Sequence, residues 1–177
     1  MLNKRTNVKR LWFFLFKPHT TMKNGGGFQL ILSFKNAENN ENVVFKQDGQ
    51  RFGTSQRTLK LFSNAKYKIH ITAKPGGDFH NLHCGGSDLE LIPDAPDSGE
   101  YTALWNTTGI DPNKKGERQD LLFVLSGPAG SLRKQLQTKF YNRGDSHAEW
   151  GHKLEQLIWS CAVDATGTIT VVDEQSL

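Results

Sequence analysis

The sequence predicts an all-β protein, an antiparallel β-sandwich or flattened barrel of about ten strands. Three observations support this: short apolar runs recur from Phe28 onward, turn residues separate them, and several runs alternate apolar and polar residues. A period of two is typical of a strand with one buried face. A chain of 177 residues is long enough to bury a core as one domain.

The first 24 residues differ from the rest in charge. The chain has no acidic residue before Glu38, whereas seven basic residues precede it, which leaves the remainder mildly acidic. The apolar run at residues 11–16 is too short to span a bilayer. We expect residues 1–24 to be a basic, disordered extension ahead of a start near Met22, and residues 25–177 to form a single β-sandwich domain. A basic segment beside aromatic residues also suits contact with an anionic membrane surface.

Four strands are expected in the first half of the domain. The clearest is residues 67–74, where Tyr67, Ile69, Ile71 and Ala73 alternate with polar residues. The others are at residues 28–34, 43–46 and 57–62, the last of which follows the turn signal Asp48-Gly49.

Further short candidates follow along the chain, at residues 79–84, 89–92, 101–105 and 168–172. Residues 121–125 form a continuous apolar run, which indicates a strand buried on both faces. Residues 132–141 fit both a helix and a strand, and we favour a strand from context. Residues 154–163 have the same ambiguity.

Several motifs resemble the cannabinoid-receptor-interacting protein family, in the family's order and over about residues 28–177. The residues that carry the resemblance are Asp48-Gly49-Gln50-Arg51-Phe52-Gly53, Arg57-Thr58-Leu59-Lys60-Leu61, Tyr67-Lys68, Gly116-Glu117-Arg118-Gln119, Lys139-Phe140-Tyr141-Asn142 and Trp150-Gly151.

The resemblance implies a fold similar to Rho GDP-dissociation inhibitors and a non-enzymatic adaptor. Such an adaptor would bind the cytoplasmic C-terminal tail of a G-protein-coupled receptor, the type 1 cannabinoid receptor in the family, and modulate its signalling. It implies a cytoplasmic protein, found at the inner face of the plasma membrane when receptor-bound. The alternative is a carrier that shelters lipidated protein tails in an apolar cleft between the sheets.

Five residues are candidates for partner contact: Arg51, Arg57, Arg118, Trp105 and Trp150. Arginine forms bidentate hydrogen bonds with the carboxylates or phosphates of an acidic or phosphorylated tail. The tryptophans would stand at the mouth of an apolar cleft, and an exposed strand edge offers a second way to hold a peptide. Alternatively, the arginines are solvated or hold a loop, and the tryptophans pack in the core.

The sequence does not favour enzyme chemistry, a metal or a cofactor. His80, His83 and Cys84 are the densest group of metal-ligating residues, but in a strand the two histidines would not converge. The phosphate-binding, dinucleotide-binding and hydrolase motifs are absent from the sequence. Cys84 and Cys161 are expected to be free thiols, and we expect no nucleic-acid partner beyond what the basic extension itself would attract.

Overall fold

The computed structural model describes residues 27–47 and 57–177. Within these ranges the regular structure is almost entirely β, with a single short 3₁₀ helix, η1 (Ser146–Glu149). Residues 1–24 and the turn signal at Asp48-Gly49 lie outside the described residues. The division into a basic extension and one domain therefore stays a prediction.

Thirteen strands of the described residues form the sheet. In chain order they are β1 (Gly27–Asn36), β2 (Val44–Gln47), β3 (Arg57–Phe62), β4 (Lys66–Lys74), β5 (Asn81–Cys84), β6 (Ser87–Glu90), β7 (Ile92–Pro93), β8 (Glu100–Asn106), β9 (Gln119–Gly127), β10 (Gly130–Tyr141), β11 (His152–Lys153), β12 (Leu157–Val163) and β13 (Thr168–Ser176).

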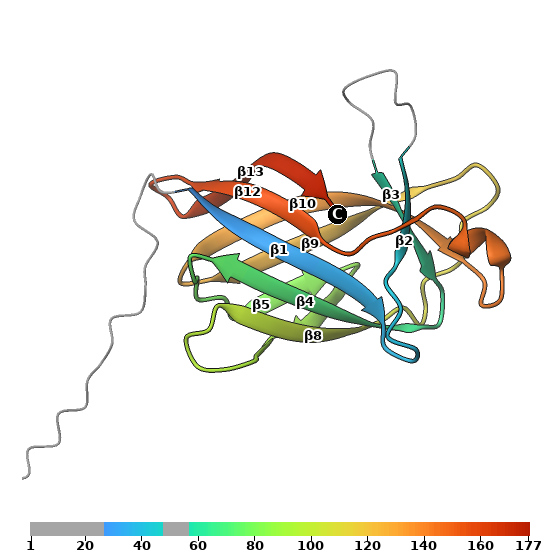
Figure 1. Cartoon of the computed structure of the whole chain (residues 1–177), viewed down its shortest axis with the longest axis horizontal. Coiled ribbons are helices and arrows are strands. Elements are labelled where there is room, and N and C mark those ends of the chain that lie inside the picture. Colours follow the sequence, from blue (N-terminus) through green and yellow to red (C-terminus); the bar gives the residue numbers. More distant parts are fainter. Residues whose placement is uncertain (1–26, 48–56) are drawn as a thin grey trace, which may run out of the picture.

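The strands are arranged as two layers of one sheet (Figure 1). One layer has the order β7-β8-β4-β1-β12-β13, and the other β6-β5-β9-β10-β3-β2-β11. The layers are joined where β13 pairs with β10, and β6 contacts β8 on the opposite side. The result is a nearly closed, flattened barrel, which confirms the predicted fold class. The implied likeness to Rho GDP-dissociation inhibitors stays a prediction.

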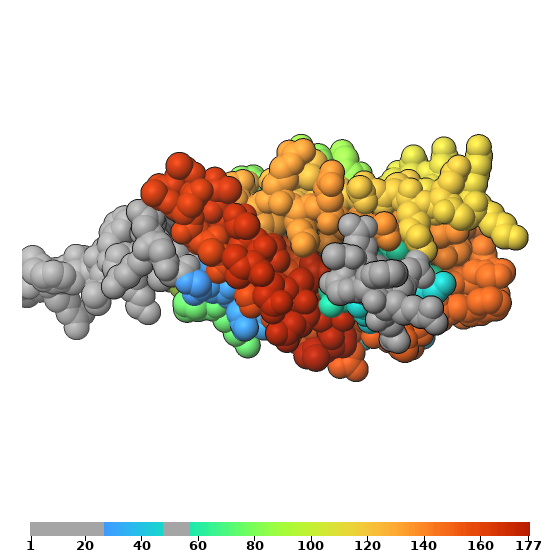
Figure 2. Space-filling view, turned by 90° about the horizontal axis from the view of Figure 1, so that it is seen from above, coloured from blue at the N-terminus to red at the C-terminus, as the bar shows by residue number. Residues whose placement is uncertain are grey.

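Strand β10 changes partner halfway along its length. Its first residues pair in parallel with β13, at Ser131↔Thr168 and Leu132↔Ile169, whereas its last four pair in parallel with β3. All the other strand pairs are antiparallel, as predicted. Beyond Ile169, β13 has only β12 as a strand partner among the described residues. In the space-filling view the red atoms of β13 cross the surface beside orange atoms of the β10 segment (Figure 2).

Most of the expected strands form close to their predicted bounds. Residues 132–141 lie within β10, so the preference for a strand is confirmed. In the ambiguous segment 154–163 the strand begins only at Leu157. The prediction for residues 121–125 was wrong: β9 is buried on one face and only half-buried on the other, at Leu122 and Val124. Among the described residues no second layer covers that outer face. An unbroken apolar run in the sequence does not reveal that one face of the strand is left uncovered.

Aromatic side chains fill the space between the layers. Phe123 of β9 meets Trp159 of β12 edge to face with ring centroids 5.5 Å apart, and Trp105 of β8 meets Phe140 of β10 in the same way at 6.2 Å. All four side chains are almost completely buried. Edge-to-face pairs add to the free energy already gained from apolar burial.

Candidate functional site

The structure places four of the five candidate residues, and they do not form one cluster. Arg51 lies outside the described residues. Arg57 begins β3, Trp105 lies in β8, Arg118 lies just before β9, and Trp150 follows η1. Each has a different environment.

The expectation that Trp105 stands at a cleft mouth was wrong. Its side chain is 1% exposed and packs between Tyr67 and Phe140. Tyr67 also lies beneath the turn after β3, where its hydroxyl oxygen accepts a hydrogen bond from the Phe62 amide at 2.7 Å. Trp105 is therefore a core residue, which is the alternative that the sequence left open.

Arg57 is held by an internal carboxylate rather than presented to solvent. Its Nη1 atom lies 2.6 Å from Oε1 of Glu174 in β13. The other oxygen of Glu174 accepts from the indole N–H of Trp159 at 2.8 Å and lies 3.2 Å from Nζ of Lys134. Glu174 thus links β13 to β3, β10 and β12 at the point where β10 changes partner. Nη1 of Arg57 is therefore already occupied by an internal carboxylate.

Trp150, like Arg118, is an exposed candidate that a partner can reach. Its side chain is 61% exposed, and its ring lies against the ring of His147 with centroids 4.4 Å apart. Beside it is a groove of about 440 Å³ lined by Phe45, Lys60 and His152 among others. We call the residues Trp150, His147, Lys60, Lys139 and Tyr141 the Trp150 surface. It lies at one end of the long axis of the molecule, where η1 is drawn in orange (Figure 1).

Local hydrogen bonds fix the position of Trp150. Asp145 caps η1, and its carboxylate accepts from both the backbone N–H and the ring Nδ1 of His147. The amide hydrogen bond is the main cause that lowers the pKa of Asp145, so this carboxylate stays charged. After Trp150 the chain runs against β2 at Gly151, where φ is +147° and a Cβ atom would meet the carbonyl oxygen of Phe45. Only glycine allows this approach.

Positive charges gather on the Trp150 surface. Lys60 and Lys139 are register partners on β3 and β10, and their ammonium groups lie 5.5 and 5.4 Å from the centroid of the Tyr141 ring. Lys60 also donates hydrogen bonds to the backbone carbonyls of His147 and Trp150. Burial and the charge of Asp145 raise the pKa of Tyr141, whereas the charge of Arg118 lowers it. The exposed Arg118 is therefore within electrostatic reach of this surface.

The sequence reasoning found Trp150 and Arg118 but missed Lys60, Lys139, Tyr141 and His147 as their neighbours. All but His147 belong to the motifs that carry the family resemblance. Periodicity indicates that Lys60 and Lys139 point outward but not that β3 and β10 are adjacent, because 78 intervening residues separate them. A parallel pairing of this kind has no local signal.

The histidines that suggested a metal site pair with neighbouring carboxylates instead. His80 lies 3.0 Å from Asp78, and His83 lies 2.8 Å from Asp88. The described residues contain no group of three or more His, Cys, Asp or Glu side chains placed to hold a metal ion. Nor is there, in the same ranges, a helix of the length and apolarity needed to cross a membrane.

The chain is similar to known proteins along most of its length. Residues 24–177 match the family model described as CB1 cannabinoid receptor-interacting protein 1. The CB1 cannabinoid receptor-interacting proteins 1 of Mus musculus and Homo sapiens are each 32% identical to it over 158 residues. In both cases the match covers 85% of this chain and 96% of the relative.

Proposed function

Because the chain belongs to the CB1 cannabinoid receptor-interacting protein 1 family, we propose that it is a non-enzymatic adaptor for a G-protein-coupled receptor. It binds the receptor's cytoplasmic C-terminal tail and modulates the receptor's signalling. The names of the relatives state an interaction with the CB1 cannabinoid receptor. That shared family is the observation that carries the proposal.

The Trp150 surface supplies a physical way to hold such a tail. An exposed tryptophan beside a groove is the kind of anchor that dominates binding energy at interfaces. Lys60 donates to the Trp150 carbonyl, Lys139 lies over the Tyr141 ring, and the charge of Arg118 acts on Tyr141. These groups favour carboxylates or phosphate groups on the tail. A tail that lays one apolar residue against Trp150 and places acidic residues over the lysines satisfies both features.

Replacement of the tryptophan tests this binding mode. In titration calorimetry with a peptide of the receptor tail, Trp150→Ala should weaken affinity about 10- to 30-fold, near the ~2 kcal/mol of an interface hot spot. The matched control is Leu104→Ala, because Leu104 is equally exposed, at 62%, but lies on β8. The control should bind as the parent does, and raised salt should weaken binding by the parent.

Two results would count against the proposal in different ways. If the parent chain binds no receptor-tail peptide, with or without phosphate groups, the adaptor function is wrong. If the parent binds but Trp150→Ala and Leu104→Ala behave alike, the function stands and the tail lies elsewhere on the molecule.

The second candidate, a carrier of lipidated tails, requires room between the layers. Trp105, Trp159, Phe123 and Phe140 occupy that region, and each is at most 1% exposed. Lipid entry would therefore require the layers to part and the core to repack, which costs the free energy of that buried apolar contact. A farnesylated peptide that binds more tightly than its unmodified form would favour the carrier.

The proposed adaptor function implies a location in the cell. We infer a cytoplasmic protein that moves to the inner face of the plasma membrane when a receptor tail is present. Imaging of the labelled chain in cells with and without the receptor tests this, and a distribution that ignores the receptor would contradict it.

A further inference from the structure

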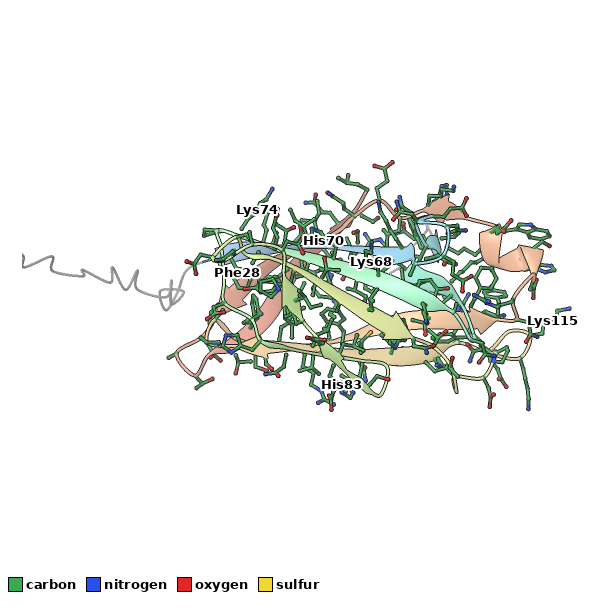
Figure 3. The ribbon with its side chains drawn as sticks, turned by 90° about the horizontal axis from the view of Figure 1, so that it is seen from below. Phe28, Lys68, His70, Lys74, His83 and Lys115 are labelled. Atoms are coloured by element: carbon green, nitrogen blue, oxygen red, sulfur yellow. The ribbon has the colours of Figure 1, made fainter. Side chains whose placement is uncertain are left out.

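A second group of positive charges lies on the outer face of the other layer. Lys35 of β1 and Lys68 of β4 stand directly opposite each other in an antiparallel pair, and Leu104 of β8 stands opposite Lys68 on its other side. Lys66 and Lys74 extend the group along β4. In the side-chain view Lys68, His70 and Lys74 project from β4 on one side of the molecule (Figure 3). We call Lys35, Lys66, Lys68, Lys74 and Leu104 the β4 face.

The lysines of the β4 face have no carboxylate partner among the described residues. Among the described residues, Lys35, Lys66, Lys68 and Lys74 make no ion pair, and three of them are exposed. Like charges directly opposite each other destabilise an antiparallel pair. The fold therefore tolerates a repulsion between Lys35 and Lys68 that a single neutral side chain would remove.

The acidic groups near the β4 face do not neutralise it. Asp94 lies 3.4 Å from His70 and accepts a hydrogen bond from Thr102. Glu100 stands opposite Thr72, four residues along β4 from Lys68. Both carboxylates lie toward the Lys74 end. At the other end Glu38 pairs with Arg143 and Glu41 accepts from Asn39, so neither pairs with Lys35 or Lys68.

Apolar side chains border the same row. Leu104 is 62% exposed and Ile92 of β7 is 51% exposed. Ile92 stands opposite Thr102 and so points outward from the same layer as Leu104. Two large aliphatic side chains therefore share the outer face of this layer with the lysines.

We propose that the β4 face docks the protein on an anionic phospholipid membrane. Lysines spread over a broad outer sheet face match the many separate charges of lipid headgroups. The exposed aliphatic side chains can enter the headgroup region beside them. In contrast, the Trp150 surface concentrates its charge around a groove and an aromatic ring, which suits one peptide. This membrane contact does not depend on the receptor-tail proposal.

Docking through the β4 face leaves the Trp150 surface accessible. That surface lies at the end of the long axis, beyond β2, whereas β1, β4 and β8 form the broad layer (Figure 1). The two surfaces can therefore be occupied together, and each can be removed by substitution without touching the other.

Co-sedimentation with vesicles tests the proposal. The full chain should bind phosphatidylcholine vesicles that contain phosphatidylserine and should not bind pure phosphatidylcholine. Each lysine near an anionic surface contributes about fivefold, so Lys35→Gln/Lys68→Gln should weaken binding roughly 25-fold. The matched control, Lys114→Gln/Lys115→Gln, removes the same charge from an exposed loop. Lys115 lies at the far end of the molecule from Lys74 (Figure 3). The control should bind within about twofold of the parent because of screening over that distance.

A leader variant separates this face from the basic N-terminal residues. If Lys9→Gln/Arg10→Gln abolishes vesicle binding while Lys35→Gln/Lys68→Gln does not, the leader is the membrane element and the proposal is overturned. Equal losses in the face and loop variants, binding to pure phosphatidylcholine, or binding to an acidic peptide but to no vesicle would also overturn it.

Thermal unfolding distinguishes lost docking from lost structure. Because it relieves a like-charge pair, Lys35→Gln/Lys68→Gln should unfold at a temperature no lower than the parent. Weaker vesicle binding together with equal or higher stability would support a docking role. A lower unfolding temperature with weaker binding would mean that the pair serves the fold, and the proposal would fail.

Discussion

Thr107 holds the turn between β3 and β4 from within. The single proton of its buried hydroxyl lies within reach of the carbonyls of Phe62 and Ala65, at 2.7 and 3.1 Å, and its oxygen accepts from the Ala65 amide at 2.9 Å. Thr107→Val keeps the shape but removes the hydroxyl's hydrogen bonds to the Phe62 carbonyl and the Ala65 amide, whereas the Ala65 carbonyl still accepts from the Thr107 amide. The loss should lower the free energy of unfolding by about 1–3 kcal/mol. Urea unfolding measures it. Thr108→Val, at the exposed neighbour, should stay within about 0.5 kcal/mol of the parent.

The buried thiols make stability depend on alkaline pH. Burial raises the pKa of Cys84 from 9.0 to about 12 and that of Cys161 to about 11. In that range the unfolded chain has lost protons that the folded chain keeps, so stability is full below pH 9 and falls as pH rises toward these values. Burial also raises the pKa of Tyr67 to about 12, which adds to the fall. Urea unfolding between about pH 8 and about pH 11 measures the slope. Cys84→Ala should reduce that slope, and an unchanged slope would show that Cys84 does not contribute.

The two candidate tryptophans show what a single residue reveals in the sequence. Trp105 and Trp150 both follow short apolar or polar stretches that give no sign of their different exposure. Trp105 is buried because β8 pairs with β4 and places it between Tyr67 and Phe140. Trp150 is exposed because η1 carries it past the edge of β2. Contacts between segments that are distant in sequence therefore decide which of the two tryptophans is buried.

The position of β13 relies on Glu174. Glu174→Ala removes the common acceptor of Arg57, Lys134 and Trp159 and leaves two positive charges close to each other. We expect the free energy of unfolding to fall by about 1–3 kcal/mol. Asp173→Ala, one residue earlier on the exposed side, should change it by less than about 0.5 kcal/mol. Equal effects in urea unfolding would show that Glu174 makes no special link.

Element by element, alternation was the dependable signal. Strand β4 alternates strictly and formed where expected, since one of its faces is in the core and the other in solvent. The continuous apolar run of β9 has no period, and its half-exposed outer face was missed. The change of partner in β10 was also unpredictable. These two parallel pairings depend on which distant segments of the chain lie beside β10. Local strand propensity does not indicate which segments those are.

Folding of the whole molecule should be slow because its decisive contacts are remote in sequence. Thr58 bonds to Gln137 across 79 residues, and Arg57 pairs with Glu174 across 117. Proteins dominated by such contacts fold in about milliseconds to seconds. Stopped-flow refolding followed by tryptophan fluorescence should show a phase in this range, because Trp105 and Trp159 become buried only when both layers meet. Refolding complete within microseconds would contradict this.

For the whole molecule, the fold class was predictable and the arrangement of sites was not. Strand number and alternation indicated a sandwich or flattened barrel, since few other architectures bury many short strands. The Trp150 surface joins residues of β3, β10 and η1, and the β4 face joins residues of β1, β4 and β8. The order of the strands in the sheet brings the residues of each surface together. In the sequence these residues are far apart, so neither surface can be recognised there.

The sparse attachment of β13 has a mechanical consequence. A pulling force applied at Ser176 acts first on its pair with Leu157, at the open end of the β12–β13 hairpin. Under such a load an antiparallel hairpin unzips one pair at a time, and strand pairing with β10 holds β13 only at the far end, through Thr168 and Ile169. The C-terminal strand should therefore open in two steps, first up to the ion pairs of Glu174 with Arg57 and Lys134 and then, once these break, up to Ile169, while the rest of the barrel stays closed.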